Sequence, residues 1–162
     1  MKVKAGGVPG NHGQVSIRPA FSPVQCGVMT VIWVSTLPLK GGKMKIIRPS
    51  EVKIEEENRP VFSGKVTRRA LIGTDMGKNF NAGIVHWAAG SRCKLNTHTS
   101  DQILIVTAGK GIIATEKQEF SVGTGDVIFI PAGESHWHGA AKGSSFSHIS
   151  ILTKESQTLW QD

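Results

Sequence analysis

The sequence predicts an all-β domain, either a β-barrel or a β-sandwich. Short apolar runs recur between residues 61 and 152, and glycine-centred turns separate them at regular spacing. Glycine makes up 19 of the 162 residues, which suits a fold with many tight turns. No amphipathic helix of useful length is apparent, and this argues against a doubly wound α/β fold.

The expected elements follow from these runs in chain order. Residues 50–59 are acidic, and we expect a short helix or a loop there. The run at 102–107 is the strongest, and Ala108-Gly109 is expected to end it. The expected strands are 61–62 with 65–72, 82–87, 102–107, 111–115, 118–122, 127–130, 136–139 and 146–152. The side chains expected to pack in the interior are Phe80, Phe129, Phe146, Trp87, Trp137 and Cys93.

The charge is unevenly distributed along the chain. The net charge is +7, and residues 1–43 contribute five bases and no acid, so they account for +5 of it. Residues 44–162 hold 14 bases and 12 acids, which gives +2. This balance does not support a nucleic-acid-binding face, because five bases spread over 43 residues are too sparse to follow a phosphate backbone.

Residues 1–43 are interpreted as an N-terminal extension that is poorly ordered or foreign to the native domain, and residues 44–162 as a single domain. Met44-Lys45-Ile46 resembles a fresh protein start, so an upstream start codon is one explanation. A secretory signal, an organelle transit peptide and an ordinary arm are the alternatives. The apolar run at 28–39 is too short to span a bilayer. Two cysteines, Cys26 and Cys93, make no disulfide framework, so we expect a cytoplasmic protein without membrane association.

Histidines and amides form two short motifs in the second half of the chain. Asn96-Thr97-His98 is followed by Gln102, and His136-Trp137-His138 repeats the alternation. Residues two apart in a strand face the same side, so Asn96 and His98 can reach one point. A metal held inside a β-barrel needs such polar pairs on adjacent strands.

The spacing of these motifs resembles that of the cupins. The positions that match the two halves of the cupin pattern are Gly90, Asn96, His98, Gln102 and Gly109, then Gly125, Pro131, Gly133, His136 and Ala140. The resemblance implies a double-stranded β-helix, or jelly-roll barrel. Residues 60–152 are further similar to manganese-dependent hydroxynitrile lyases and to cupins associated with carboxymuconolactone-decarboxylase-type domains.

This resemblance implies a metal site formed by His98, Gln102, His136 and Asn96. The expected metal is a divalent transition ion, Mn, Fe, Ni or Zn, with Mn favoured by the resemblance. Asn96 departs from the group, which has histidine at that position, and an amide oxygen is a weaker ligand than imidazole. Asn96 is therefore either a ligand or a hydrogen-bonding residue, and the metal is either retained or lost.

Two functions remain open at this point. In the first, the chain is an enzyme acting on a small molecule, with the metal as Lewis acid and His138 or His148 moving a proton. The resemblance implies a lyase, and the same ligands would suit a dioxygenase. In the second, the chain is a non-catalytic cupin that binds or senses a small ligand. His86 is expected to lie outside the site, and the resemblance implies a homodimer paired through sheet edges, which would also cover exposed strand edges.

Overall fold

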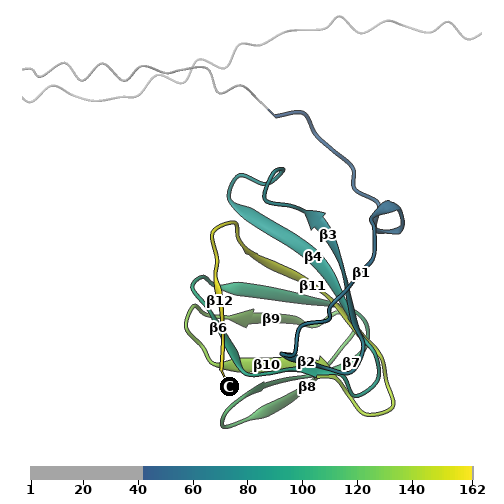
Figure 1. Cartoon of the computed structure of the whole chain (residues 1–162), viewed down its shortest axis with the longest axis vertical. Helices are drawn as coiled ribbons and strands as arrows, with labels where there is room; N and C mark the ends of the chain where they lie inside the picture. Colours follow the sequence, from purple (N-terminus) through teal and green to yellow (C-terminus); the bar gives the residue numbers. More distant parts are fainter. Residues whose placement is uncertain (1–41, 162) are drawn as a thin grey trace, which may run out of the picture. The chain divides into compact units, whose positions relative to one another are not determined.

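The computed structural model describes residues 42–161, so the interpretation of residues 1–43 lies almost entirely outside the described part (Figure 1). A 3-10 helix, η1, covers Pro49–Glu51. The strands are β1 Glu55–Glu56, β2 Phe62–Ser63, β3 Val66–Ile72, β4 Phe80–Trp87, β5 Arg92–Cys93, β6 Asn96–His98, β7 Gln102–Thr115, β8 Glu119–Gly123, β9 Val127–Ile130, β10 His136–Ala140, β11 Phe146–Thr153 and β12 Thr158–Trp160. Within the described residues, no helix has the length and apolar character needed to cross a membrane.

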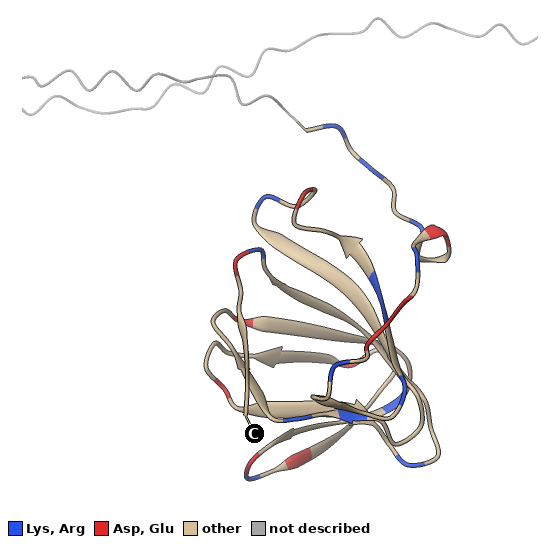
Figure 2. Cartoon of the chain, viewed as in Figure 1, with Lys and Arg blue, Asp and Glu red and all other residues tan. Residues whose placement is uncertain are grey.

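All strand pairs are antiparallel and form one curled sheet around the interior (Figure 1). The order along the sheet is β1-β3-β4-β11-β7-β10-β5-β2, while β8 and β9 pair with β7, and β6 pairs with β10 and β12. This confirms the all-β prediction and agrees with a jelly-roll barrel. The acidic strand β1 pairs with β3, which places the red segment at residues 55–57 beside basic residues of β3 (Figure 2).

Strand β7 joins two strands that the sequence predicts separately. Its first half pairs with β9 and β11, and its second half pairs with β8 and β10. Gly109 has φ +75° and bends the strand where it passes from one wall of the barrel to the other. A glycine that permits a bend and a glycine that ends a strand give the same sequence signal, so the pattern could not separate them.

The short strands β1, β5 and β12 have two or three residues each, too few to produce an alternating pattern. They were not predicted. The expected strand at 127–130 is confirmed with the same bounds, and the acidic segment holds η1 and β1.

Strand alternation also decides which aromatic residues are buried. Phe146, Trp87 and Cys93 belong to the core, as predicted. The prediction was wrong for Phe80 and Phe129, which are 48% and 63% exposed. Their neighbours along the strand face the interior instead, because successive side chains in a strand point to opposite sides.

Candidate metal and ligand site

The predicted site residues meet inside the barrel. Strands β6, β7, β10 and β11 carry them, and the pairing of β10 with β6 sets His136 directly opposite Asn96. A cavity of about 120 Å³ is lined by Asn96, His98, Gln102, His138 and His148, together with residues of β3, β4 and β12. His136 lies beside His98, with 5.3 Å between the ring centres. His86 is exposed and bonds to Ser147, away from this cluster, as expected.

Three of these residues present a free ligand atom while the far end of the side chain is held. His98 Nδ1 lies 3.1 Å from the Thr158 hydroxyl, and His98 Nε2 is buried without a partner among residues 42–161. His136 Nδ1 lies 2.9 Å from the Glu134 carbonyl, and its Nε2 is likewise free. Gln102 donates from Nε2 to the Ser150 hydroxyl at 3.0 Å, which leaves Oε1 free. Buried polar atoms are normally paired, so three free ones within one cluster require an explanation.

Asn96 behaves differently from these three. Its side-chain nitrogen donates to the backbone carbonyls of His136, at 3.0 Å, and Lys94, at 3.2 Å. It also contacts the Cys93 sulfur at 3.7 Å. The Asn96 side chain therefore ties β6 to β10. Burial raises the pKa of the Cys93 thiol to about 11, so this sulfur stays protonated in the interior.

His138 and His148 both line the cavity and contact each other edge to face, with ring centres 4.9 Å apart. The indole N–H of Trp87 donates to His148 Nε2 at 3.1 Å. An indole can only donate, so this nitrogen is the unprotonated one and the His148 ring is neutral. His138 Nδ1 is buried and unpartnered within the described residues.

Burial governs the charge state of all four histidines. It lowers the pKa of His98 to about 4, with a further reduction from the charge on His136, and the nearby Gln102 side chain opposes this reduction. It lowers the pKa of His148 to about 4, and the backbone of Ile149 opposes this slightly. The pKa of His136 is also lowered by burial, and that of His138 falls well below its usual value for the same reason. All four rings are thus neutral at pH 7, the state in which imidazole can bind a metal.

The candidate ligand set contains two histidines and one or two amides. Within residues 42–161, no group of three or more His, Cys, Asp or Glu side chains is arranged to hold a metal ion. The donors that remain, two imidazole nitrogens and an amide oxygen, are chemically suitable for a first-row divalent ion. They carry no negative charge to offset it.

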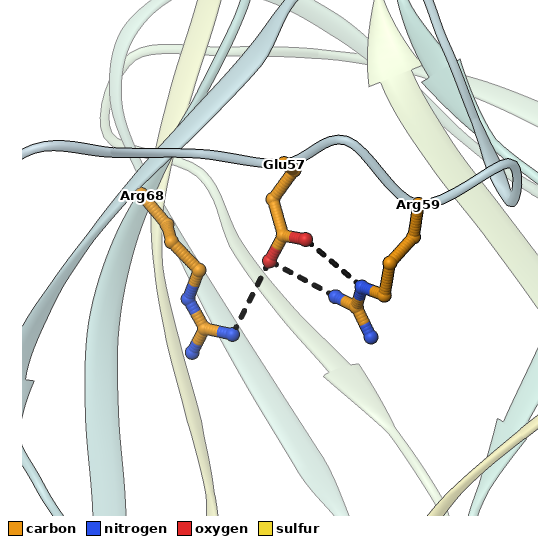
Figure 3. A network of polar contacts seen from close by, with 3 residues as sticks. All are labelled: Glu57, Arg59 and Arg68. Atoms are coloured by element: carbon orange, nitrogen blue, oxygen red, sulfur yellow. Dashed lines mark hydrogen bonds and ion pairs between the residues drawn. The ribbon is translucent and has the colours of Figure 1, made fainter.

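Sequence reasoning missed a charged network that borders the same cavity. Glu57 receives two hydrogen bonds from Arg59, from Nε and Nη2, both at 2.9 Å, and a third from Arg68 Nη1 at 3.4 Å (Figure 3). All three residues line the cavity. The alternation of β3 contained a signal for it, because Arg68 lies two residues after the buried Val66 and so shares its face.

Comparisons with known proteins agree with this architecture. The family model described as a cupin domain matches residues 83–151. An (R)-mandelonitrile lyase from Granulicella tundricola is 40% identical over 68 residues, which is 41% of this chain and 52% of the lyase. The chain therefore spans about half the length of that curated relative.

Solved structures extend the likeness over more of the chain. A cupin-like protein from Thermotoga maritima has a TM-score of 0.62 and 32% identity, over 65% of this chain and 83% of that one. A polyketide cyclase from Streptomyces resistomycificus has a TM-score of 0.66 at 22% identity, over 74% and 88% of the two chains, and shares the fold alone. The barrel, the motif spacing and these matches together show that the chain belongs to the cupins, as a small member that resembles hydroxynitrile-lyase-like proteins.

Proposed function

We propose that this cupin is a metal-dependent enzyme that acts on a small molecule, with lyase chemistry favoured and dioxygenase chemistry as the second form. One observation carries the proposal. His98 Nε2, His136 Nε2 and Gln102 Oε1 are buried without partners within the described residues, and the opposite atom of each side chain is tethered. Tethering of the far ring nitrogen is how proteins orient metal-binding histidines.

His98, His136 and Gln102 would hold the ion, with the Asn96 oxygen as a fourth donor. Mn is the favoured metal by resemblance, and Fe, Ni and Zn suit the same atoms. A bound divalent ion would supply Lewis acidity toward a substrate oxygen. Because the donors are neutral, we expect binding weaker than in a site with a third imidazole or a carboxylate.

His138 and His148 have different roles in the proposed proton transfer. His148 Nε2 accepts from the Trp87 N–H, which fixes the His148 tautomer with its proton on Nδ1, and this Nδ1 is also buried without a partner within the described residues. His138 has a free Nδ1, and burial keeps its ring neutral. We therefore assign proton acceptance from the substrate to His138, and we assign to His148 the positioning of the His138 ring, which it contacts edge to face.

The alternative is a non-catalytic cupin that binds or senses a small ligand. Asn96 favours it, because the side-chain nitrogen is committed to two backbone carbonyls and the set lacks an anionic ligand. The pocket would then bind its ligand without the metal. The two functions differ in metal content and in turnover.

Metal analysis of protein purified without a His tag separates them. We expect a substantial fraction of one equivalent per chain in wild type and a strong loss in His98→Ala, with His86→Ala as the exposed control. Less than a tenth of an equivalent under every growth condition would contradict the metalloenzyme proposal. Mandelonitrile serves as a neutral reference substrate for lyase activity, followed by absorbance of released benzaldehyde, because the similar lyase is named for it.

We also propose that the chain forms a homodimer. The outer surface where β7 and β9 pair is apolar, with Ile103, Val127 and Phe129 exposed by 37%, 66% and 63%. Covering apolar surface of this kind is favourable, and a second copy presents the same surface. In the proposed dimer, this face is a contact surface in addition to the sheet edges through which the resemblance implies pairing.

A further inference from the structure

The cavity is lined by charged residues as well as by histidines. Strand β3 carries Val66, Arg68 and Ala70 on one face, and Val66 is in the core, so Arg68 points toward the barrel interior. The Arg68 side chain is nevertheless 44% exposed. It therefore reaches from the strand to the opening of the cavity, where a ligand would first meet the protein.

Glu57 shows how a carboxylate sits at this opening. Its two oxygens are bound by Arg59 in a two-point contact, and one oxygen also meets Arg68 (Figure 3). Arg59 is further held over the rings of Phe62, at 5.0 Å, and Trp160, at 5.8 Å. Arg59 is thus fixed by its own neighbours, while Arg68 makes a single long contact.

Arg68 keeps donors for another group. A guanidinium has five N–H donors, and within the described residues only Nη1 of Arg68 has a hydrogen-bond partner. Its Nη2 lies over Gly83, 3.8 Å from where a Cβ would stand. Gly83 also lines the cavity, and a Cβ there would stand 3.0 Å from the Arg69 carbonyl oxygen, so the wall beside Arg68 Nη2 carries no side chain at this position.

The charge around the cavity favours an anion. Among the lining residues, Arg59 and Arg68 contribute two positive charges and Glu57 one negative charge, which leaves +1. The lining histidines His98, His138 and His148 are neutral, so they add none. Low-dielectric walls strengthen the attraction that such an excess exerts on a small anion.

We propose that Arg68 binds the carboxylate of a small organic acid whose remaining atoms extend into the cavity toward the histidines. The planar fork of a guanidinium matches a carboxylate at two points, which a lysine or a neutral donor could not do. The substrate class is thus a small carboxylate, smaller than or comparable to the cavity of about 120 Å³. This inference names a substrate class for the proposed function. It depends on the proposed function only for the reaction that follows binding.

The experiment compares lactate with lactamide, which have nearly the same shape and differ in charge. Binding to the full-length, EDTA-treated protein is measured by calorimetry at low salt. We expect lactate to bind at least several-fold more tightly than lactamide. Arg68→Gln should weaken lactate binding roughly five- to tenfold and leave lactamide unchanged, since partly exposed charged contacts have energies of that order.

Two further variants make the result specific. Arg69→Gln removes the same charge from the opposite face of β3 and should leave both ligands unaffected. Arg68→Lys keeps the charge without the fork and should recover only part of the lactate affinity. Thermal melts of each variant identify any loss of folding.

Equal affinity for lactate and lactamide, or an equal effect of Arg69→Gln and Arg68→Gln, would overturn the proposal. Inorganic phosphate bound as tightly as lactate and lost in the same variant would overturn the carboxylate assignment in favour of a general anion site. Metal content is measured on the same proteins, purified without a His tag, before the EDTA treatment. If the protein prefers lactate but binds no metal, the proposed metalloenzyme is refuted and the carboxylate site stands. If it binds metal but shows no preference for lactate, the carboxylate site is refuted and the metalloenzyme proposal stands.

Discussion

Acidification should destabilise this barrel through His148, and the size of the effect follows from its burial. The side chain is fully buried and its pKa is lowered to about 4, while an unfolded histidine titrates near its ordinary value of 6.5. Between these two values the unfolded chain binds a proton that the folded chain does not, so stability falls as the pH decreases through that window. Protonation would also set an N–H of His148 against the N–H of Trp87.

The linkage relation gives the magnitude for this single group. Between pH 7.5 and pH 5.0, an unfolded pKa near 6.5 and a folded pKa near 4 cost about 2 kcal/mol of unfolding free energy. The other buried histidines add to the wild-type loss in the same direction. His148→Gln removes the titration and keeps an oxygen that can accept from Trp87, so we expect this variant to lose about 2 kcal/mol less than wild type over the same pH change.

Urea unfolding of the EDTA-treated proteins at the two pH values measures this difference directly. His86→Gln is the matched control, because it removes an exposed imidazole from the neighbouring strand and should lose as much stability as wild type. The reasoning is refuted if His148→Gln and wild type lose equal stability on acidification while the slopes of their urea transitions agree.

Three further predictions concern the metal, the packing and the assembly. Asn96→His should raise metal occupancy in tag-free protein, and unchanged occupancy would place Asn96 outside the ligand set. Gly111→Ala should lower the unfolding free energy by about 1–3 kcal/mol, because a Cβ there would lie 2.6 Å from the Phe146 ring. Gly123→Ala is its control, because no described residue other than its chain neighbours lies within 4 Å of the added carbon. Phe129→Asp should convert the proposed dimer to a monomer in light scattering coupled to size exclusion, and a mass unaffected by the charge would exclude this face as the interface.

Much of the fold was predictable because strand sequences carry a local signal. Alternating or continuous apolar residues bounded by glycine and proline identify strands such as 127–130, and the fixed spacing of polar residues identifies the cupin pattern. The same period of two predicts that His98 lies on the same face as Asn96, and His136 on the same face as His138. The metal and proton roles of these residues remain predictions.

The errors share one physical origin. Phe80 and Phe129 were assigned to the core from their apolarity, although alternation places them on the outer face. Gly109 was expected to end a strand and instead bends one. In each case the residue type was compatible with two environments, and only the pairing of distant strands selected one.

The all-β class, the cupin spacing and the identity of the candidate ligands can be read from the chain, because they depend on residue type and local period. Which atoms are free and which are tethered depends on how the strands pack. Glu57 meets Arg68 through the pairing of β1 with β3, and Trp87 reaches His148 through the pairing of β4 with β11. Such contacts join residues that are far apart in the chain, and no local pattern records them, because hydrogen bonds and burial depend on where the curled sheet brings its strands together.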